Sequence, residues 1–418
     1  MCLRRIMDYL SRAKTLASAG PKTCNHAQRE TRTDNAPPCP SGSPNRKCSG
    51  RGEVVLYALT VALTLAYLFY RTPLYGFNFQ LYRDISRIAL SGGNPYAHVY
   101  GDMPPLKHAV YSIVEHFDVW RLFHFAWFTL LPILTWALTR RLHGSTRYAW
   151  IMLILLLGSQ APYKNWLAEG TEDKAVACAL TLTVLYLSTF AVTRVTAGLQ
   201  GLVVGLSASW EGAGWFLLPV LLVHYSRRGR IVWFLGAFAI TVALSHVPFY
   251  PQWIHGYAAR AALMSAGQPY WHSIFTLIAR PPLAIYRPWM PKALTAAVAA
   301  LVFAKFLLGS NLTRTLALAN FVAFAFAGEA SFYRVLGGTI PLLPLIVPYP
   351  RYWLPEFFLL GATVTRGPFN HVHEARTLLL AMWVPLALPF VVVFGMDLVS
   401  NWKYLRERVE GLRRPGPG

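Results

Sequence analysis

Two aspartates lie in one polar stretch of the chain, close to basic side chains, and could act as a catalytic base there. Asp84 lies between Arg83 and Arg87, and Asp102 lies in a Gly-Asp-Met-Pro-Pro bend. A carboxylate can take the proton from a hydroxyl group as its oxygen attacks, and positive charge can stabilise a phosphate leaving group. The prolines after Asp102 fix the backbone. We therefore expect Asp102 to be the first candidate for a catalytic base and Asp84 the second. The alternatives are an Asx turn at Asp102 and a local surface ion pair at Asp84.

Basic side chains that could bind the phosphate surround these aspartates and recur later in the chain. Arg83 and Arg87 are four residues apart, so on a helix they could flank one anion. The other predicted substrate-binding residues are His98, Lys107, His108, Glu172, Asp173, Glu211 and Arg334. Three of these predictions have plain structural alternatives: a helix N-terminus for the adjacent acids Glu172 and Asp173, a protonated structural glutamate for Glu211, and interfacial anchoring for Arg334. Mg or Mn could use the oxygens of Asp84, Asp102 and Glu172, but we predict no metal site.

The composition argues strongly against a soluble enzyme. Of the 418 residues, 55% are hydrophobic and 14% are charged, and the net charge is +21, whereas soluble proteins carry about 25% charged residues. The cations stand between long apolar runs, which is typical of a membrane surface rather than of a nucleic-acid site. The five cysteines form no CxxC pair, so we expect unpaired thiols rather than a zinc site.

The apolar runs predict an all-α, polytopic membrane protein with about 11–12 membrane segments, since a spanning helix needs about 20 mostly apolar residues. Three parts are expected: a basic, disordered cytoplasmic segment 1–52, a membrane domain 53–400 and a basic cytoplasmic tail 401–418. The predicted spans are 54–70, 119–138, 148–163, 174–193, 197–224 as two short pieces, 231–249, 291–309, 315–331, 336–349, 352–364 and 376–399.

The basic clusters set the expected orientation in a plasma membrane or an ER-type membrane. If the N-terminal segment is cytoplasmic, the clusters around Arg140, Arg227 and Lys403 fall on the cytoplasmic side, provided that 197–224 enters and returns to one face around Ser209–Gly214. Both termini are then cytoplasmic. The opposite face receives 71–118, 164–173, 250–290, 328–335 and 365–375, and it is there that we expect the chemistry.

The first outer loop, 71–118, contains a predicted amphipathic helix in the plane of the interface. Leu81, Ile85, Ile88 and Ala89 follow helical spacing and make one apolar stripe, with the charged residues on the other faces. Gly92-Gly93 should end this helix.

This loop resembles the first extracytoplasmic loop of polyprenol-phosphate-sugar-dependent glycosyltransferases of the GT-C superfamily. The resemblance is to the prokaryotic mannosyltransferase-like members and the catalytic subunit of the GPI first mannosyltransferase. It rests on Asn78-Phe79-Gln80-Leu81-Tyr82, on Gly92-Gly93-Asn94-Pro95-Tyr96 and on Gly101-Asp102-Met103-Pro104-Pro105-Leu106. Weaker similarity extends over about residues 54–400, through 168–174, 197–219 and 331–334.

The resemblance implies a GT-C-like fold and an inverting membrane glycosyltransferase. Such an enzyme moves a hexose, mannose-like, from a polyprenyl (dolichyl-type) phosphate carrier to a hydroxyl group of a glycan, lipid or protein acceptor on the extracytoplasmic side. The family's Asp-x-Asp pair is missing, because Gly76 and Asn78 occupy its positions. The second hypothesis is therefore a catalytically inactive relative that binds or moves a lipid. The third is an unrelated transporter, although no repeat of paired halves is visible.

Overall fold

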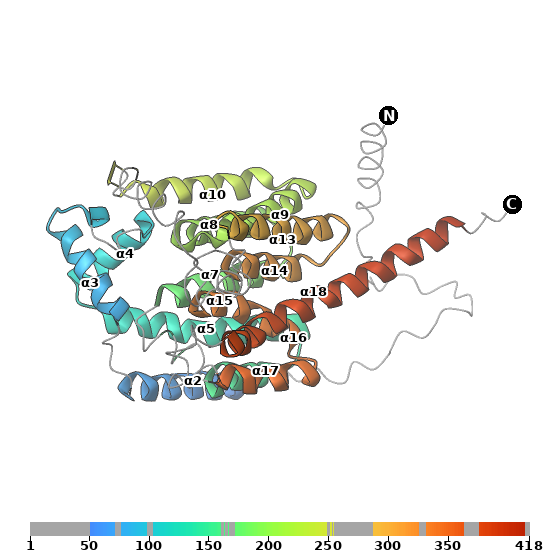
Figure 1. The fold of residues 1–418 in the computed structure, drawn as a ribbon, viewed down its shortest axis with the longest axis horizontal. Coiled ribbons are helices and arrows are strands. Elements are labelled where there is room, and N and C mark those ends of the chain that lie inside the picture. The colour runs from blue at the N-terminus through green and yellow to red at the C-terminus, as the bar shows by residue number, and fades with distance from the viewer. Residues whose placement is uncertain are drawn as a thin grey trace. The chain divides into compact units, whose positions relative to one another are not determined.

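The computed structural model describes residues 51–71, 77–97, 103–159, 163, 166, 172–248, 251–252, 254, 287–325, 332–362 and 376–413. Two compact units divide the chain, Met1–Val55 and Leu56–Gly418. The segment 1–52, predicted to be disordered, lies outside the described residues except for residues 51 and 52. The described part is helical without strands (Figure 1), which confirms the all-α prediction for that part of the chain.

The helices follow the predicted apolar runs closely. They are α2 (Arg51–Arg71), α3 (Phe77–Leu90), η1 (Pro95–Ala97), α4 (Pro105–His116), α5 (Trp120–His143), α6 (Thr146–Leu153), η2 (Ile154–Gly158), α7 (Glu172–Leu187), α8 (Arg194–Glu211), α9 (Ala213–Arg227), α10 (Ile231–His246), α13 (Met290–Leu307), α14 (Leu312–Ala325), α15 (Phe332–Thr339), η4 (Ile340–Leu342), α16 (Leu343–Ile346), α17 (Pro350–Ala362) and α18 (Arg376–Arg413).

Helix α18 runs through the boundary predicted between the membrane domain and the C-terminal tail. A span ending at 399 and a separate tail 401–418 were expected, but α18 continues to Arg413. Residues 400–413 are more polar but contain no proline and only one glycine, Gly411. A change from apolar to charged residues does not end a helix unless the backbone is also interrupted.

Among the helices that the structure describes, two are long and apolar enough to cross a membrane, α5 and α13. Other apolar helices are shorter, among them α10 and α14. Many large apolar side chains are exposed on these elements, including Val232 and Ile240 on α10 and Leu301 on α13. Exposed apolar surface of this extent marks an interaction surface for lipid or protein.

Helices α8 and α9 form the predicted pair of short helices around Ser209–Gly214. The break falls at Gly212, whose φ of 79° is a left-handed conformation that glycine adopts without strain. Directly after it, Gly214 lies against the backbone of α8: a Cβ atom there would come within 2.3 Å of Val204 O. This close approach holds Glu211, the last residue of α8, at the junction of the two helices.

Helices α8 and α10 also pack backbone to backbone, side by side in Figure 1. A Cβ atom on Gly201 would lie 2.2 Å from Phe234 O, and one on Gly205 would lie 2.8 Å from Thr241 Cβ. Small residues four apart permit this approach, as in packed membrane helices. Helix α8 is thereby fixed along its length.

Helix α3 is the predicted amphipathic helix of the first loop. Ile85 in its apolar stripe is fully buried. The helix ends at Leu90, just before Gly92, whose φ is 79°. Gly92 N donates to Ala89 O at 3.1 Å and Gly93 N donates to Ile88 O at 2.9 Å. These are the bonds of a Schellman motif.

Candidate functional site

Five charged side chains from four helices meet in one group, which we call the ionic cluster: Lys107, Asp173, Lys174, Glu211 and Arg334. Lys107 Nζ donates to Asp173 Oδ2 at 2.9 Å and also to Glu211 Oε1. Lys174 Nζ lies 2.8 Å from the same Asp173 oxygen and 2.9 Å from the same Glu211 oxygen. Arg334 Nη2 lies 4.0 Å from Glu211 Oε2. Two carboxylates are thus shared by two ammonium groups and flanked by a guanidinium.

The members of the cluster differ in their contact with solvent. The side chains of Asp173, Lys107 and Glu211 are 3%, 5% and 6% exposed, whereas Arg334 is 23% exposed. Taking charges out of water is costly unless they are paired and hydrogen-bonded. The buried centre is paired in this way, and its more accessible side is the one occupied by Arg334 and Lys174.

Helix ends bring these residues together. Lys107 lies in the first turn of α4, which begins at Pro105 because proline fits that position. Asp173 and Lys174 lie in the first turn of α7, and Glu211 ends α8. Trp210 fixes two of these elements to each other, since its Nε1 donates to the backbone oxygen of Asp173 at 2.9 Å.

The electrostatics of the cluster keep both kinds of side chain charged. Burial alone would raise the pKa of Asp173, but the two lysine ammonium groups outweigh it and hold that pKa well below its ordinary value. Burial likewise tends to lower the pKa of Lys107, yet Asp173 and Glu211 raise it above its ordinary value. Asp173 and Lys107 therefore form a charged pair at the centre of the cluster.

Two polar atoms of the cluster have no hydrogen-bond partner among the described residues, Asp173 Oδ1 and Arg334 Nε. Both are buried atoms, one an acceptor and one a donor. Buried polar groups normally find partners, so a ligand with both an acceptor and a donor would complement this pair.

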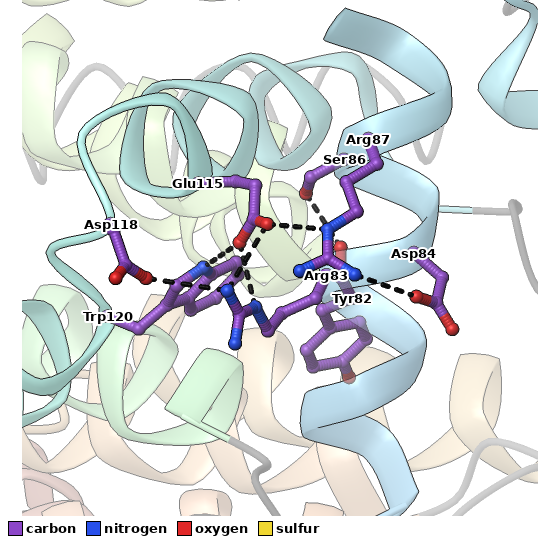
Figure 2. Close-up of polar contacts among 8 residues, drawn as sticks. All are labelled: Tyr82, Arg83, Asp84, Ser86, Arg87, Glu115, Asp118 and Trp120. Carbon is purple, nitrogen blue, oxygen red and sulfur yellow. Dashed lines mark hydrogen bonds and ion pairs between the residues drawn. The ribbon is translucent and has the colours of Figure 1, made fainter.

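A second group of charges holds the first loop (Figure 2). Glu115 on α4 accepts hydrogen bonds from Arg83 Nε at 2.9 Å and Arg87 Nε at 2.7 Å, and also from Trp120 Nε1. Asp118, in the turn after α4, lies 3.4 Å from Arg83 Nη2. Arg83 and Arg87 flank one anion, as their spacing predicts, but the anion in this structure is a carboxylate of the protein.

The pKa of Glu115 reflects these bonds. Partial burial would raise it, but the hydrogen bonds from the two arginines and Trp120 together lower it below its ordinary value. Asp84, the second candidate for the base, is 59% exposed and lies 3.7 Å from Arg87. This is the local surface pair considered as its alternative role.

The remaining predicted residues are only partly described. Asp102 and His98 lie outside the described residues, as does the side chain of Glu172. His108 is buried, with its ring edge-on to Tyr96 at 4.7 Å between centroids. Within the described ranges, no group of three His, Cys, Asp or Glu side chains could hold a metal ion.

Sequence reasoning found four members of the ionic cluster and missed Lys174. It also missed Glu115, the partner of both arginines. Lys174 directly follows Asp173, so its position was visible, whereas Glu115 carries no local signal that it would reach α3, 28 residues away from Arg87.

No family model matches this chain, and no curated protein matches it significantly.

Proposed function

We propose that this chain is an integral membrane glycosyltransferase of the GT-C type, which transfers a hexose from a polyprenyl-phosphate carrier to an acceptor hydroxyl group with inversion. The observation that carries the proposal is the ionic cluster. Its residues come from 71–118, 164–173, the Gly212 junction and 328–335 or their immediate borders. The predicted orientation puts 71–118, 164–173 and 328–335 on one extracytoplasmic face. The Gly212 junction, expected within the membrane, contributes Glu211 to the same cluster.

The membrane part of the proposal rests on the surface of the helices. Helices α5 and α13 have the length and hydropathy of a span. The exposed apolar side chains of α10 and α13 would be covered by lipid. Neither observation depends on the ionic cluster, so the two lines of support are independent.

The reaction needs a base and a site for the leaving phosphate. The acceptor oxygen attacks the anomeric carbon while a carboxylate takes its proton, and the bond between that carbon and the phosphate oxygen breaks. Lys107, Lys174 and Arg334 would stabilise the negative charge that develops on the carrier phosphate. Asp102 remains our first candidate for the base and Asp84 the second, and a divalent cation, Mg or Mn, stays optional.

The direct test is sugar transfer from radiolabelled polyprenyl-phosphate mannose, and from the glucose donor in parallel, in membrane vesicles from cells that express the full-length chain and from cells that lack it. We expect transfer to an endogenous lipid or glycan acceptor, and its loss in Asp102→Asn. Asp397→Asn is the matched control, because Asp397 is a buried acid paired with Lys305 outside the cluster. Folded protein that transfers no sugar from either donor would refute the enzyme hypothesis.

The second candidate function is binding or movement of a polyprenyl lipid without transfer. The absence of carboxylates at Gly76 and Asn78 favours it, and so does the exposure of Asp84. Binding of the carrier with no transfer from either donor would select this function over the enzyme.

A further inference from the structure

The ionic cluster is already filled by its own carboxylates. Each lysine ammonium contacts both Asp173 Oδ2 and Glu211 Oε1. A phosphate oxygen that approached these ammonium groups would be a third anion within a few ångströms of two others. Like charges at such distances disfavour one another strongly where water is scarce.

Asp173 and Glu211 differ in how many of their oxygens contact a cation. Both Glu211 oxygens face cations, Oε1 the two lysines and Oε2 Arg334. Asp173 binds the lysines through Oδ2 alone, and its buried Oδ1 has no partner among the described residues. A proton on Oδ1 would remove one negative charge and create a donor where a buried acceptor is now unsatisfied.

We propose that the ionic cluster binds a phosphodiester head group together with one proton, which Asp173 Oδ1 carries and donates to a phosphate oxygen. The charged groups that face Asp173 are Lys107 from α4, Lys174 from α7 and Glu211 from α8, with Arg334 from α15 beyond Glu211. The phosphate contacts the ammonium groups, and the uptake of the proton relieves the repulsion. The only covalent change in this step is the O–H bond that forms on Asp173 Oδ1 with a proton taken from water, and no bond to phosphorus or carbon changes. The choice of a phosphodiester rests on the proposed function.

The sign of the pH dependence follows from proton linkage. Before binding, Asp173 is ionised because the lysines hold its pKa below the ordinary value. In the complex, the phosphate offsets the lysine charges, so the pKa rises. Between these two pKa values the affinity falls as the pH rises, by about tenfold for each pH unit. Above the upper pKa it is constant.

The test uses the full-length protein in phosphatidylcholine nanodiscs and, as probe, the methyl ester of polyprenyl phosphate. This diester cannot donate a sugar and carries one charge at every pH used. We expect the wild type to take up about one proton on binding, measured by calorimetry in two buffers of different ionisation enthalpy. Asp173→Asn should take up none and should bind at least about a thousandfold more tightly at pH 7.5, because its amide supplies the donor without the cost of protonating an acid whose pKa before binding is below 3.8.

Asp173→Ala, which supplies no donor, should bind with no pH dependence. The matched control is again Asp397→Asn, since it neutralises a buried acid held by Lys305 and Arg314 and should leave the affinity unchanged. Inorganic phosphate and phosphatidylglycerol are separate arms. Equal binding of either would show that the site recognises the anion without the polyprenyl carrier and would overturn the choice of ligand.

The proposal is overturned if Asp173→Asn, folded by thermal unfolding, binds the diester no more tightly than the wild type, or if the wild type takes up no proton. Neither readout requires sugar transfer. Proton-linked binding without sugar transfer would therefore refute the enzyme hypothesis and support the proton-linked site. Sugar transfer without proton uptake on binding would support the enzyme hypothesis and refute the proton-linked site.

Discussion

Glu115 is the acidic partner of two arginines from another helix, so at the scale of single residues it is the most informative side chain of the first loop. Its oxygens accept hydrogen bonds from Arg83, Arg87 and the indole N–H of Trp120 (Figure 2). The arginines remain partly exposed, and solvent screens such pairs. The contribution of Glu115 is therefore expected to be smaller than that of a fully buried ion pair.

We predict that Glu115→Gln lowers the free energy of unfolding by about 1–2 kcal/mol, because an amide keeps the shape but loses three charge-assisted contacts. Denaturant titration of the protein in detergent measures this. The control is Asp84→Asn, whose side chain is exposed and 3.7 Å from its partner, and which should change stability by less than about 0.5 kcal/mol. Equal effects of the two substitutions would contradict the prediction.

We also predict that the contribution of Glu115 to the free energy of unfolding depends on pH. The pKa of Glu115 is lowered in the folded protein, so its contribution is present above the ordinary glutamate pKa of 4.5 and is lost as the pH falls through the lower folded value. The difference in stability between wild type and Glu115→Gln should therefore be constant near neutrality and shrink below about pH 4.5. A difference that grew on acidification would have the wrong sign.

At the scale of the helices, the glycines of α8 determine how closely it approaches its neighbours. Gly201 and Gly198 are three residues apart on the same helix, but only Gly201 lies against another backbone. A Cβ atom at Gly201 would sit 2.2 Å from Phe234 O, whereas one at Gly198 would have no atom within 4 Å. The two positions therefore separate helix packing from helix propensity.

We predict that Gly201→Ala destabilises the protein by about 1–3 kcal/mol, because α8 and α10 must move apart to admit the methyl group. Gly198→Ala should be neutral or stabilising by up to about 1 kcal/mol, since alanine favours the helix. Unfolding in detergent measures both. A destabilised Gly198→Ala variant, or an unaffected Gly201→Ala variant, would contradict this account of the α8–α10 contact.

The helices were predictable because each apolar run is a local property of the chain, and so was the junction at Gly212. The pairing of charges was not. Lys107 lies 66 residues from Asp173 and 104 residues from Glu211, and no local pattern carries the packing that brings them together. The length of α18 does not follow from its apolar run, because composition locates a membrane boundary, whereas backbone interruptions locate the end of a helix.

At the scale of the whole molecule, the ionic cluster and the basic side chain of Arg141 lie at opposite ends of α7. The ionic cluster gathers the first turns of α4 and α7, the last residue of α8 and α15. At the other end of α7, Ser188 contacts Thr313 at 2.8 Å, and Arg141 lies over the Phe190 ring at 4.8 Å. The 16 residues of α7 separate the two ends by about 24 Å, compared with about 30 Å for a bilayer core.

This polarity predicts which cysteines a charged, impermeant maleimide can reach in intact cells. Cys2, Cys24, Cys39 and Cys48 are first replaced by serine, and Cys178 is left because it is fully buried. His116→Cys, at the end of α4, should be labelled from outside. Arg228→Cys, after α9, should be labelled only in permeabilised cells, because basic residues favour the cytoplasmic side.

The third position tests the membrane itself. Ile240 on α10 is 62% exposed, so a protein in water would present Ile240→Cys to the reagent readily. We predict no labelling of Ile240→Cys in either cell preparation, because lipid excludes the charged maleimide and disfavours the thiolate that reacts with it. Denaturation should restore labelling, which shows that the thiol is intact. Rapid labelling of Ile240→Cys in the folded protein would contradict the proposal that α10 faces lipid. Labelling of His116→Cys and Arg228→Cys from the same side would contradict the predicted orientation.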